Sequence, residues 1–377
     1  MHLSLTEEQR LIVDSATSFL EDASRSSLVR DTSEHGDGFD RSLWTGLADL
    51  GWCGILLPEH LGGIGAGWVE LVLLQEQLGR RLACVPYFDS VALAGSLMQA
   101  LPPSPCARAR LGGLARGTEI LALALPAAQT NVPARVARNG PRLELSGCWP
   151  RVGSAQFAHT LLLPAQDDEG ALGIWLVPGD TPGLERIPLS VIDGTRRMAD
   201  VRAHSVNLPP SACLSRGAPL IALLERTRCL TAIALAAEQI GVAQQALDLT
   251  LAYTAQRVQF GQPVARFQAL KHRCAQMLVA LETARSAVYG AACIADTEPD
   301  PPTLLFHAAH ALGESTDAAL LCTRESIQLH GGVGFTWDYD PHLYFRRAQA
   351  SSHRLGPLSW WREQVARQLL DTSEAPA

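Results

Sequence analysis

Residues 257–268 read Arg-Val-Gln-Phe-Gly-Gln-Pro-Val-Ala-Arg-Phe-Gln, and residues 328–335 read Gln-Leu-His-Gly-Gly-Val-Gly-Phe. Both stretches interrupt sequence that is otherwise strongly helical. They supply what the phosphates of a dinucleotide require: a fixed cation, side-chain amides, and glycines that let backbone N–H groups approach. Either stretch alone is a weak signal. Found together in the last third of one chain, they are a strong one.

Helical periodicity surrounds both stretches. It predicts long helices over 219–257, 268–296 and 303–329, with a proline-rich loop near residues 299–302. Three long helices joined by short connections favour an up-and-down bundle.

The spacing of apolar residues along the chain changes at about Glu119. Before it, apolar residues recur at helical spacing, and residues 1–118 are predicted to form an all-α domain. Residues 119–212 carry apolar runs of four to six residues separated by Gly, Pro and Asp, which predicts a middle domain of antiparallel strands. Helical sequence returns over 213–377. The fold class is therefore α+β, with three domains in the order α, β, α.

Bulk composition excludes several classes of protein. The hydrophobic content is 47%, and the net charge of −7 leaves no basic surplus for nucleic acid. Nine cysteines occur without zinc-type spacing, so no metal site is predicted and a reducing compartment is favoured. The polar N-terminus lacks a signal core, and no apolar run reaches the length of a membrane span. We expect a soluble, cytoplasmic protein without a membrane partner.

The chain resembles the acyl-CoA dehydrogenase family over essentially its whole length. Besides the two stretches above, residues 58–63 (Pro-Glu-His-Leu-Gly-Gly), 76–79 (Glu-Gln-Leu-Gly) and 193–196 (Asp-Gly-Thr-Arg) resemble family elements. The resemblance implies a C-terminal four-helix-type bundle and an oxidoreductase of lipid metabolism acting on CH–CH donors. It implies a flavoprotein that transfers hydride from acyl-CoA, or another acyl thioester, to FAD held between subunits of a dimer or tetramer.

The resemblance also assigns the cofactor-binding residues. Arg257 and Gln268 match residues that reach across a dimer interface to the pyrophosphate and ribityl parts of FAD, and Phe260 would lie along the flavin's route. Taken alone, a cation at a helix end or a glycine after a helix is favourable without any ligand. The residues matched to the ADP half of the neighbouring subunit's FAD are Gln328, Gly331 and Gly332.

The chain departs from the family at the catalytic base, which must remove a proton from the α carbon. The position that holds glutamate in most members is Leu355, and the position that holds it in a second branch is Thr231. Neither side chain is a useful base at neutral pH. One acid remains on the relevant helical face, Glu238, and it is the candidate catalytic residue. The structural alternative is that Glu238 pairs with a basic partner such as Arg273.

A further departure lies in the β domain. The family usually has Thr-Glu-Pro-x-x-Gly-Ser-Asp beside the flavin ring, whereas residues 125–131 read Leu-Pro-Ala-Ala-Gln-Thr-Asn. We therefore expect one subunit of a heterotetramer whose related partner supplies the glutamate. The alternatives are a self-sufficient homo-oligomer using Glu238, a flavin monooxygenase, or a flavin-free thioester-binding or scaffold protein on the same fold.

Overall fold

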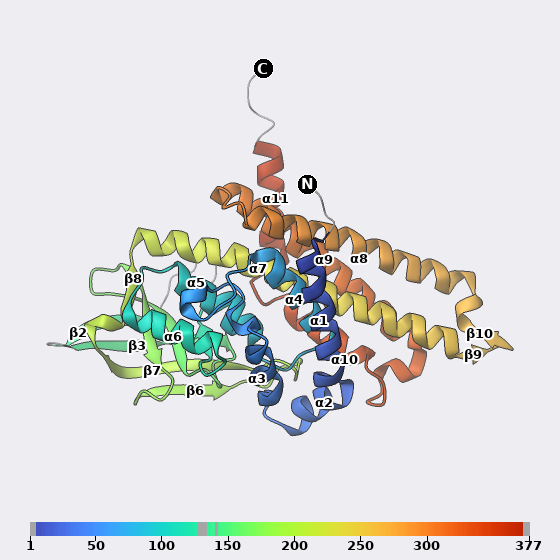
Figure 1. Ribbon diagram of the computed structural model, residues 1–377, viewed down its shortest axis with the longest axis horizontal. Helices are drawn as coiled ribbons and strands as arrows, with labels where there is room; N and C mark the ends of the chain where they lie inside the picture. Colours follow the sequence, from blue (N-terminus) through green and yellow to red (C-terminus); the bar gives the residue numbers. More distant parts are fainter. Residues whose placement is uncertain (1–4, 127–133, 140–141, 372–377) are drawn as a thin grey trace, which may run out of the picture. The chain divides into compact units, whose positions relative to one another are not determined.

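The computed structural model describes residues 5–126, 134–139 and 142–371 (Figure 1). The described elements run from helices through eight strands between Leu121 and Arg216 and back to helices, which confirms the predicted α+β class. The chain separates into two compact units. The first comprises Met1–Asp31, Trp68–Ala83 and Ala232–Ala377, and the second comprises Thr32–Gly67 and Cys84–Thr231. The domain boundaries at residues 118 and 212 stay a prediction.

The first unit is helical. Its N-terminal helix is closed by a capping box in which Thr6 and Gln9 satisfy each other's backbone N–H groups. Pro301 and Pro302 occupy the first turn of a later helix, where no backbone N–H is needed. The helices are α1 (Glu7–Ala23), α2 (Ser26–Arg30), α4 (Trp68–Arg80), α7 (Ala218–Gln256, from residue 232 onward), α8 (Gln268–Ala295), α9 (Pro301–His330), α10 (Pro341–Ser351) and α11 (Leu358–Asp371).

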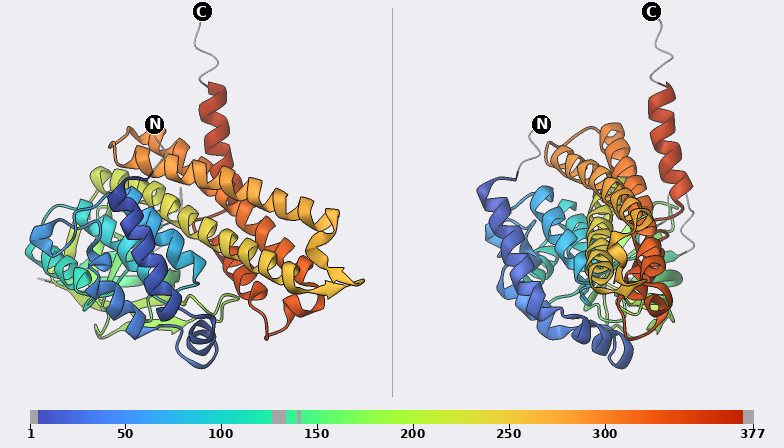
Figure 2. Two further views of the ribbon diagram at one scale, coloured as in Figure 1. Left: turned by 45° about the vertical axis from the view of Figure 1, so that its right-hand side comes forward. Right: turned by 90° about the vertical axis from the view of Figure 1, so that its right-hand side faces the viewer.

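Long helices of this unit form the predicted bundle. Helix α8 packs along α9, and α10 and α11 also pack on α9. A short hairpin of β9 (Val258–Gln259) and β10 (Gln262–Pro263) joins α7 to α8 and projects at the end of the bundle (Figure 2). The two stretches quoted at the outset thus lie in connections between bundle helices.

The second unit combines short helices with the sheet. The helical segments are η1 (Asp31–His35), whose first residue belongs to the first unit, α3 (Arg41–Asp49), η2 (Trp52–Gly54), η3 (Glu59–Leu61), the π-helix η4 (Phe88–Gly95), α5 (Ser96–Ala100), α6 (Pro105–Ala115), η5 (Pro210–Ala212) and the start of α7. The strands are β1 (Leu121–Leu123), β2 (Arg135–Asn139), β3 (Arg142–Gly153), β4 (Thr160–Gln166), β5 (Leu172–Pro178), β6 (Leu184–Pro188), β7 (Met198–Leu208) and β8 (Cys213–Arg216).

The sheet has the order β6-β7-β3-β2-β4-β5-β8, with β1 paired to β4. Its pairings are antiparallel except that β1 and β2 each pair with β4 in parallel, a detail that the antiparallel prediction missed. Trp149 and Trp175 fill the core of the sheet with the aliphatic side chains of its central strands. Strands β2, β6 and β8 were not predicted, because none of them contains an apolar run of four residues.

Helix α8 bears on the expectation that the chain has no membrane span. Among the described helices, it alone is long and apolar enough to cross a membrane by length and composition. It nevertheless carries two charged contacts to other bundle helices, Arg273 with Glu325 of α9 and Arg285 with Glu76 of α4. These ion pairs indicate that α8 packs against other helices of the bundle.

Candidate functional site

The first glycine-containing stretch is a tight hairpin. Helix α7 ends at Gln256, and the N–H of Val264 returns to the carbonyl oxygen of Arg257 at 2.8 Å. The two tip residues both have positive φ, +53° at Phe260 and +74° at Gly261, as a type I′ turn requires. Glycine suits such a position and phenylalanine does not. The phenylalanine is also 91% exposed, so local stability does not explain its presence.

The second stretch ends α9. Gly331 has a φ of +66° and donates its N–H to the carbonyl oxygen of Gln328. A Cβ atom at Gly331 or at Gly332 would meet no atom within 4 Å. The backbone at this double glycine is therefore open to an approaching ligand.

Two contacts bring these stretches to the same end of the bundle. The ring of Tyr253, one turn before the end of α7, stacks on His330 at the end of α9, with ring centroids 4.3 Å apart. At the start of α8, Arg273 donates to Glu325 of α9 at 3.0 Å. The end of α7, the start of α8 and the end of α9 are thereby held together.

The predicted cofactor-binding side chains are solvent-accessible at this end. Arg257, Gln268 and Gln328 are all exposed, and the amide nitrogen of Gln268 lies 3.2 Å from Nε2 of His272. No carboxylate in the described part of the chain pairs with Arg257. An uncompensated guanidinium, two side-chain amides and an open double glycine form a donor set that fits an anionic diphosphate. These residues therefore fit the nucleotide part of FAD.

Deeper in the same unit, α4 and α7 cross with their backbones in contact. A Cβ at Gly79 would lie 2.3 Å from the carbonyl oxygen of Glu238, and one at Gly241 would lie 2.0 Å from that of Glu76. The Glu-Gln-Leu-Gly motif of residues 76–79 thus has a packing function, because only glycine permits this approach.

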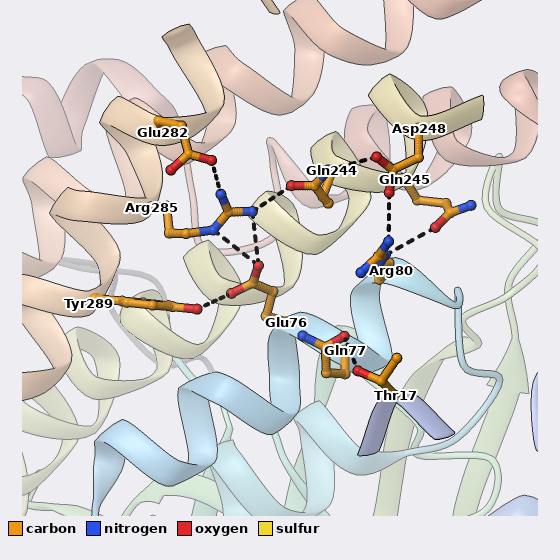
Figure 3. A network of polar contacts seen from close by, with 10 residues as sticks. All are labelled: Thr17, Glu76, Gln77, Arg80, Gln244, Gln245, Asp248, Glu282, Arg285 and Tyr289. Atoms are coloured by element: carbon orange, nitrogen blue, oxygen red, sulfur yellow. Dashed lines mark hydrogen bonds and ion pairs between the residues drawn. The ribbon is translucent and has the colours of Figure 1, made fainter. Parts of the chain in front are cut away.

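A polar network surrounds that crossing (Figure 3). Glu76 accepts hydrogen bonds from Arg285 of α8 at 3.2 Å and from the hydroxyl of Tyr289 at 2.7 Å. Arg80 donates to Asp248 of α7 at 2.6 Å. Burial raises the pKa of Tyr289, and the neighbouring Glu76 carboxylate raises it further. The network joins α4, α7 and α8. Its charged side chains bind one another and hold these helices together.

Glu238 is part of the packed interior. One carboxylate oxygen accepts from Arg347 of α10 at 2.7 Å, and the other accepts from the amide of Gln75 at 2.8 Å. The side chains of Glu238 and Arg347 are only 4% and 3% exposed. The suggested partner Arg273 is wrong, because that residue pairs with Glu325 near the end of the bundle.

The two positions that the family resemblance assigns to the catalytic base, Thr231 and Leu355, hold no acid. The hydroxyl of Thr231 is buried and donates to the carbonyl oxygen of Thr227 at 2.6 Å. Leu355 lies in the turn after α10, and its carbonyl oxygen accepts from Trp361. In the segment compared with the family's flavin-side loop, residues 127–131 lie outside the described residues.

Two residues that organise this unit escaped sequence reasoning. In the sequence, Tyr253 is not distinguished from the other residues of its helix, and no motif pairs it with His330. Arg347 has no feature in the sequence that distinguishes it from the neighbouring Arg346. Among the residues described, no group of three or more His, Cys, Asp or Glu side chains is placed to hold a metal ion.

Comparison with known proteins gives consistent matches over most of the chain. The family models described as "Acyl-CoA dehydrogenase, N-terminal domain" and "Acyl-CoA dehydrogenase, C-terminal domain" match residues 6–101 and 224–370. Acyl-CoA dehydrogenase IpdE2 of Mycobacterium tuberculosis is 34% identical over 351 residues, which is 93% of each chain.

Solved structures agree with these matches. A chain of the ChsE4-ChsE5 complex from Mycobacterium tuberculosis is 27% identical with a TM-score of 0.88, and the match covers 100% of both chains. Butyryl-CoA dehydrogenase from Megasphaera elsdenii has a TM-score of 0.89 at 24% identity, covering 98% of this chain and 100% of that one. At that identity the second likeness concerns the fold alone.

Proposed function

The chain belongs to the acyl-CoA dehydrogenase family, and we propose that it is one subunit of a heteromeric acyl-CoA dehydrogenase whose partner supplies the catalytic glutamate. The observation that carries the proposal is a contrast within one chain. The nucleotide-binding end of the bundle keeps its cation, amides and open glycines. Both positions where the family carries a base have lost the carboxylate.

The nucleotide-binding end would act through its own donors. The planar guanidinium of Arg257 can donate hydrogen bonds to two phosphate oxygens at once. Gln268 and Gln328 offer side-chain amides, and the open backbone at Gly331 and Gly332 lets a phosphate or ribose approach closely. FAD, when bound, would supply the hydride acceptor for α,β-dehydrogenation of an acyl thioester.

Exposed apolar side chains support a subunit contact at this end. Phe260, Phe335 and Trp337 are 91%, 71% and 52% exposed. Exposed large aromatic side chains are enriched at protein interfaces. A partner of the same family fits because the comparisons include a complex of two differently named chains, ChsE4 and ChsE5.

Glu238 is the remaining candidate for a base within this chain, and its surroundings favour a structural role. A general base needs an oxygen free to reach the substrate's α proton. Both oxygens of Glu238 already accept hydrogen bonds, one of them from a buried guanidinium. The self-sufficient enzyme is therefore the second candidate.

The decisive experiment compares the chain purified alone with the chain co-expressed with a family member encoded beside it. The proposal predicts that bound flavin and acyl-CoA-dependent dye reduction appear only in the co-expressed complex. A lone homo-oligomer that holds flavin and turns over would establish the self-sufficient reading. A colourless protein in every combination would favour the flavin-free thioester-binding or scaffold reading.

A further inference from the structure

Helix α7 carries a buried arginine that the proposed function does not use. Its first turns are largely exposed, but Thr227 and every residue from there to Thr231 are buried. Arg228 lies in this buried turn, and its side chain is only 5% exposed. A guanidinium stays charged when buried, so its loss of hydration must be offset by partners.

Arg228 differs sharply from the other arginine buried to this extent. Arg347, with a side chain 3% exposed, faces the buried carboxylate of Glu238 at 2.7 Å. The acid near Arg228 is Glu225, three residues earlier on the same helix, at 3.5 Å and 52% exposed. A solvated carboxylate of that kind compensates little of a buried charge. Burial is accordingly the largest influence on the pKa of the Arg228 guanidinium, and it lowers that pKa.

The hydrogen bonds of Arg228 are also incomplete. Its Nη2 donates to the carbonyl oxygen of Pro126, just after β1. Its Nε is buried and lies 3.5 Å from the carboxylate of Glu225, but it makes no hydrogen bond to any residue that the structure describes. The neighbouring hydroxyls of Thr227 and Thr231 donate to helix carbonyls at 2.8 and 2.6 Å, and neither accepts a hydrogen bond from Nε of Arg228. Within the described residues, this N–H of a buried cation therefore has no acceptor in hydrogen-bond geometry.

We infer that Arg228 binds an anionic oxygen group of the acyl-thioester ligand, either a carboxylate on the acyl chain or a phosphate of the carrier. This inference rests on the proposed function, since it takes the thioester as the ligand. It adds that Arg228 contributes to specificity for a negatively charged group. A ligand oxyanion would supply both the missing charge and an acceptor for the Nε proton.

The test measures binding rather than turnover, by calorimetry on the assembled protein. Glutaryl-CoA and valeryl-CoA have five acyl carbons each and differ by a terminal carboxylate. The pantetheine thioesters of the same two acids lack the carrier's phosphates. A carboxylate site makes glutaryl thioesters bind about 10- to 100-fold more tightly than valeryl thioesters on either carrier. A phosphate site instead makes CoA esters bind more tightly than pantetheine esters by a similar factor.

Variants connect that preference to the residue. Arg228→Met should abolish it and Arg228→Lys should retain part of it. Arg226→Met, two residues earlier on the same helix and partly exposed, should leave it unchanged. Arg228→Met should also melt at the same temperature as the wild type or higher without ligand, because an uncompensated buried charge is removed.

The outcomes separate this inference from the proposed function. Equal binding of all four thioesters to the wild type, or a preference that survives in Arg228→Met, overturns the role of Arg228 alone. Absence of binding by any thioester overturns the thioester function itself. The comparison of thioesters on the wild type needs no variant. It can therefore overturn the inference even if the Arg228→Met protein misfolds.

Discussion

Arg273 of α8 and Glu325 of α9 form an ion pair at 3.0 Å, and this pair aligns the start of one bundle helix with the end of the next. Arg273 lies five residues after Gln268, and Glu325 lies three residues before Gln328. The pair therefore brings together the two stretches that are far apart in sequence and that we assign to FAD. Both side chains are partly exposed, so its contribution to stability is small.

Breaking the buried pair of Glu238 and Arg347 distinguishes a structural acid from a catalytic one. Glu238→Gln removes the carboxylate of this buried ion pair, and breaking such a pair typically costs about 3–5 kcal/mol. We expect urea denaturation to show a loss of that size. The double variant Glu238→Gln/Arg347→Met should recover most of it. Full stability with abolished turnover in Glu238→Gln would instead identify Glu238 as the base.

The glycines at the crossing of α4 and α7 should not tolerate a methyl group. Gly79→Ala and Gly241→Ala would each place a Cβ within 2.3 Å of a backbone oxygen. Forcing the helices apart should destabilise the protein by about 1–3 kcal/mol or more. Gly290→Ala is the matched control, because a Cβ there meets nothing within 4 Å. That variant should gain up to about 1 kcal/mol from helix propensity. Equal effects at all three sites would contradict the close crossing.

Acid should weaken the protein partly through His330. Burial lowers the pKa of this side chain below its ordinary value of 6.5. As the pH falls through about 6.5, the unfolded chain binds a proton that the folded chain resists, so the free energy of unfolding falls. His330→Phe keeps a ring against Tyr253 and removes the titration. Between about pH 7.5 and pH 5.5, chemical denaturation should show a smaller loss in the variant; identical losses would contradict the assignment.

Phe260 should matter for assembly and not for the folding of the chain. Because asparagine tolerates positive φ better than phenylalanine, Phe260→Asn should leave the melting temperature of the isolated chain unchanged or raise it. Removing a 91% exposed aromatic side chain should weaken association with a partner, measured by analytical ultracentrifugation. Leu369→Asn on α11, 59% exposed, is the control. Unchanged association in Phe260→Asn would remove the hairpin tip from the interface.

Sequence reasoning reached the fold because its signals are local. The prolines in the first turn of α9, the glycine that ends α9, and the short apolar runs of β4 and β5 each act within a few residues. The site was predicted only in part. Arg257 and Gln328 stand in recognisable motifs, whereas the partner of Glu238 depends on how α10 packs against α7. Arg347 and Arg273 are equally plausible partners in sequence, and only tertiary packing selects between them.

The number of FAD molecules bound per complex in Arg257→Ala tests the central claim most directly. Arg266→Ala is the matched control, because Arg266 is another exposed arginine of the same connection. The account predicts that Arg257→Ala folds and assembles normally but retains far less flavin absorbance after gel filtration than the wild type, while Arg266→Ala retains it fully. Wild-type flavin content in Arg257→Ala, or equal losses in both variants, would contradict it.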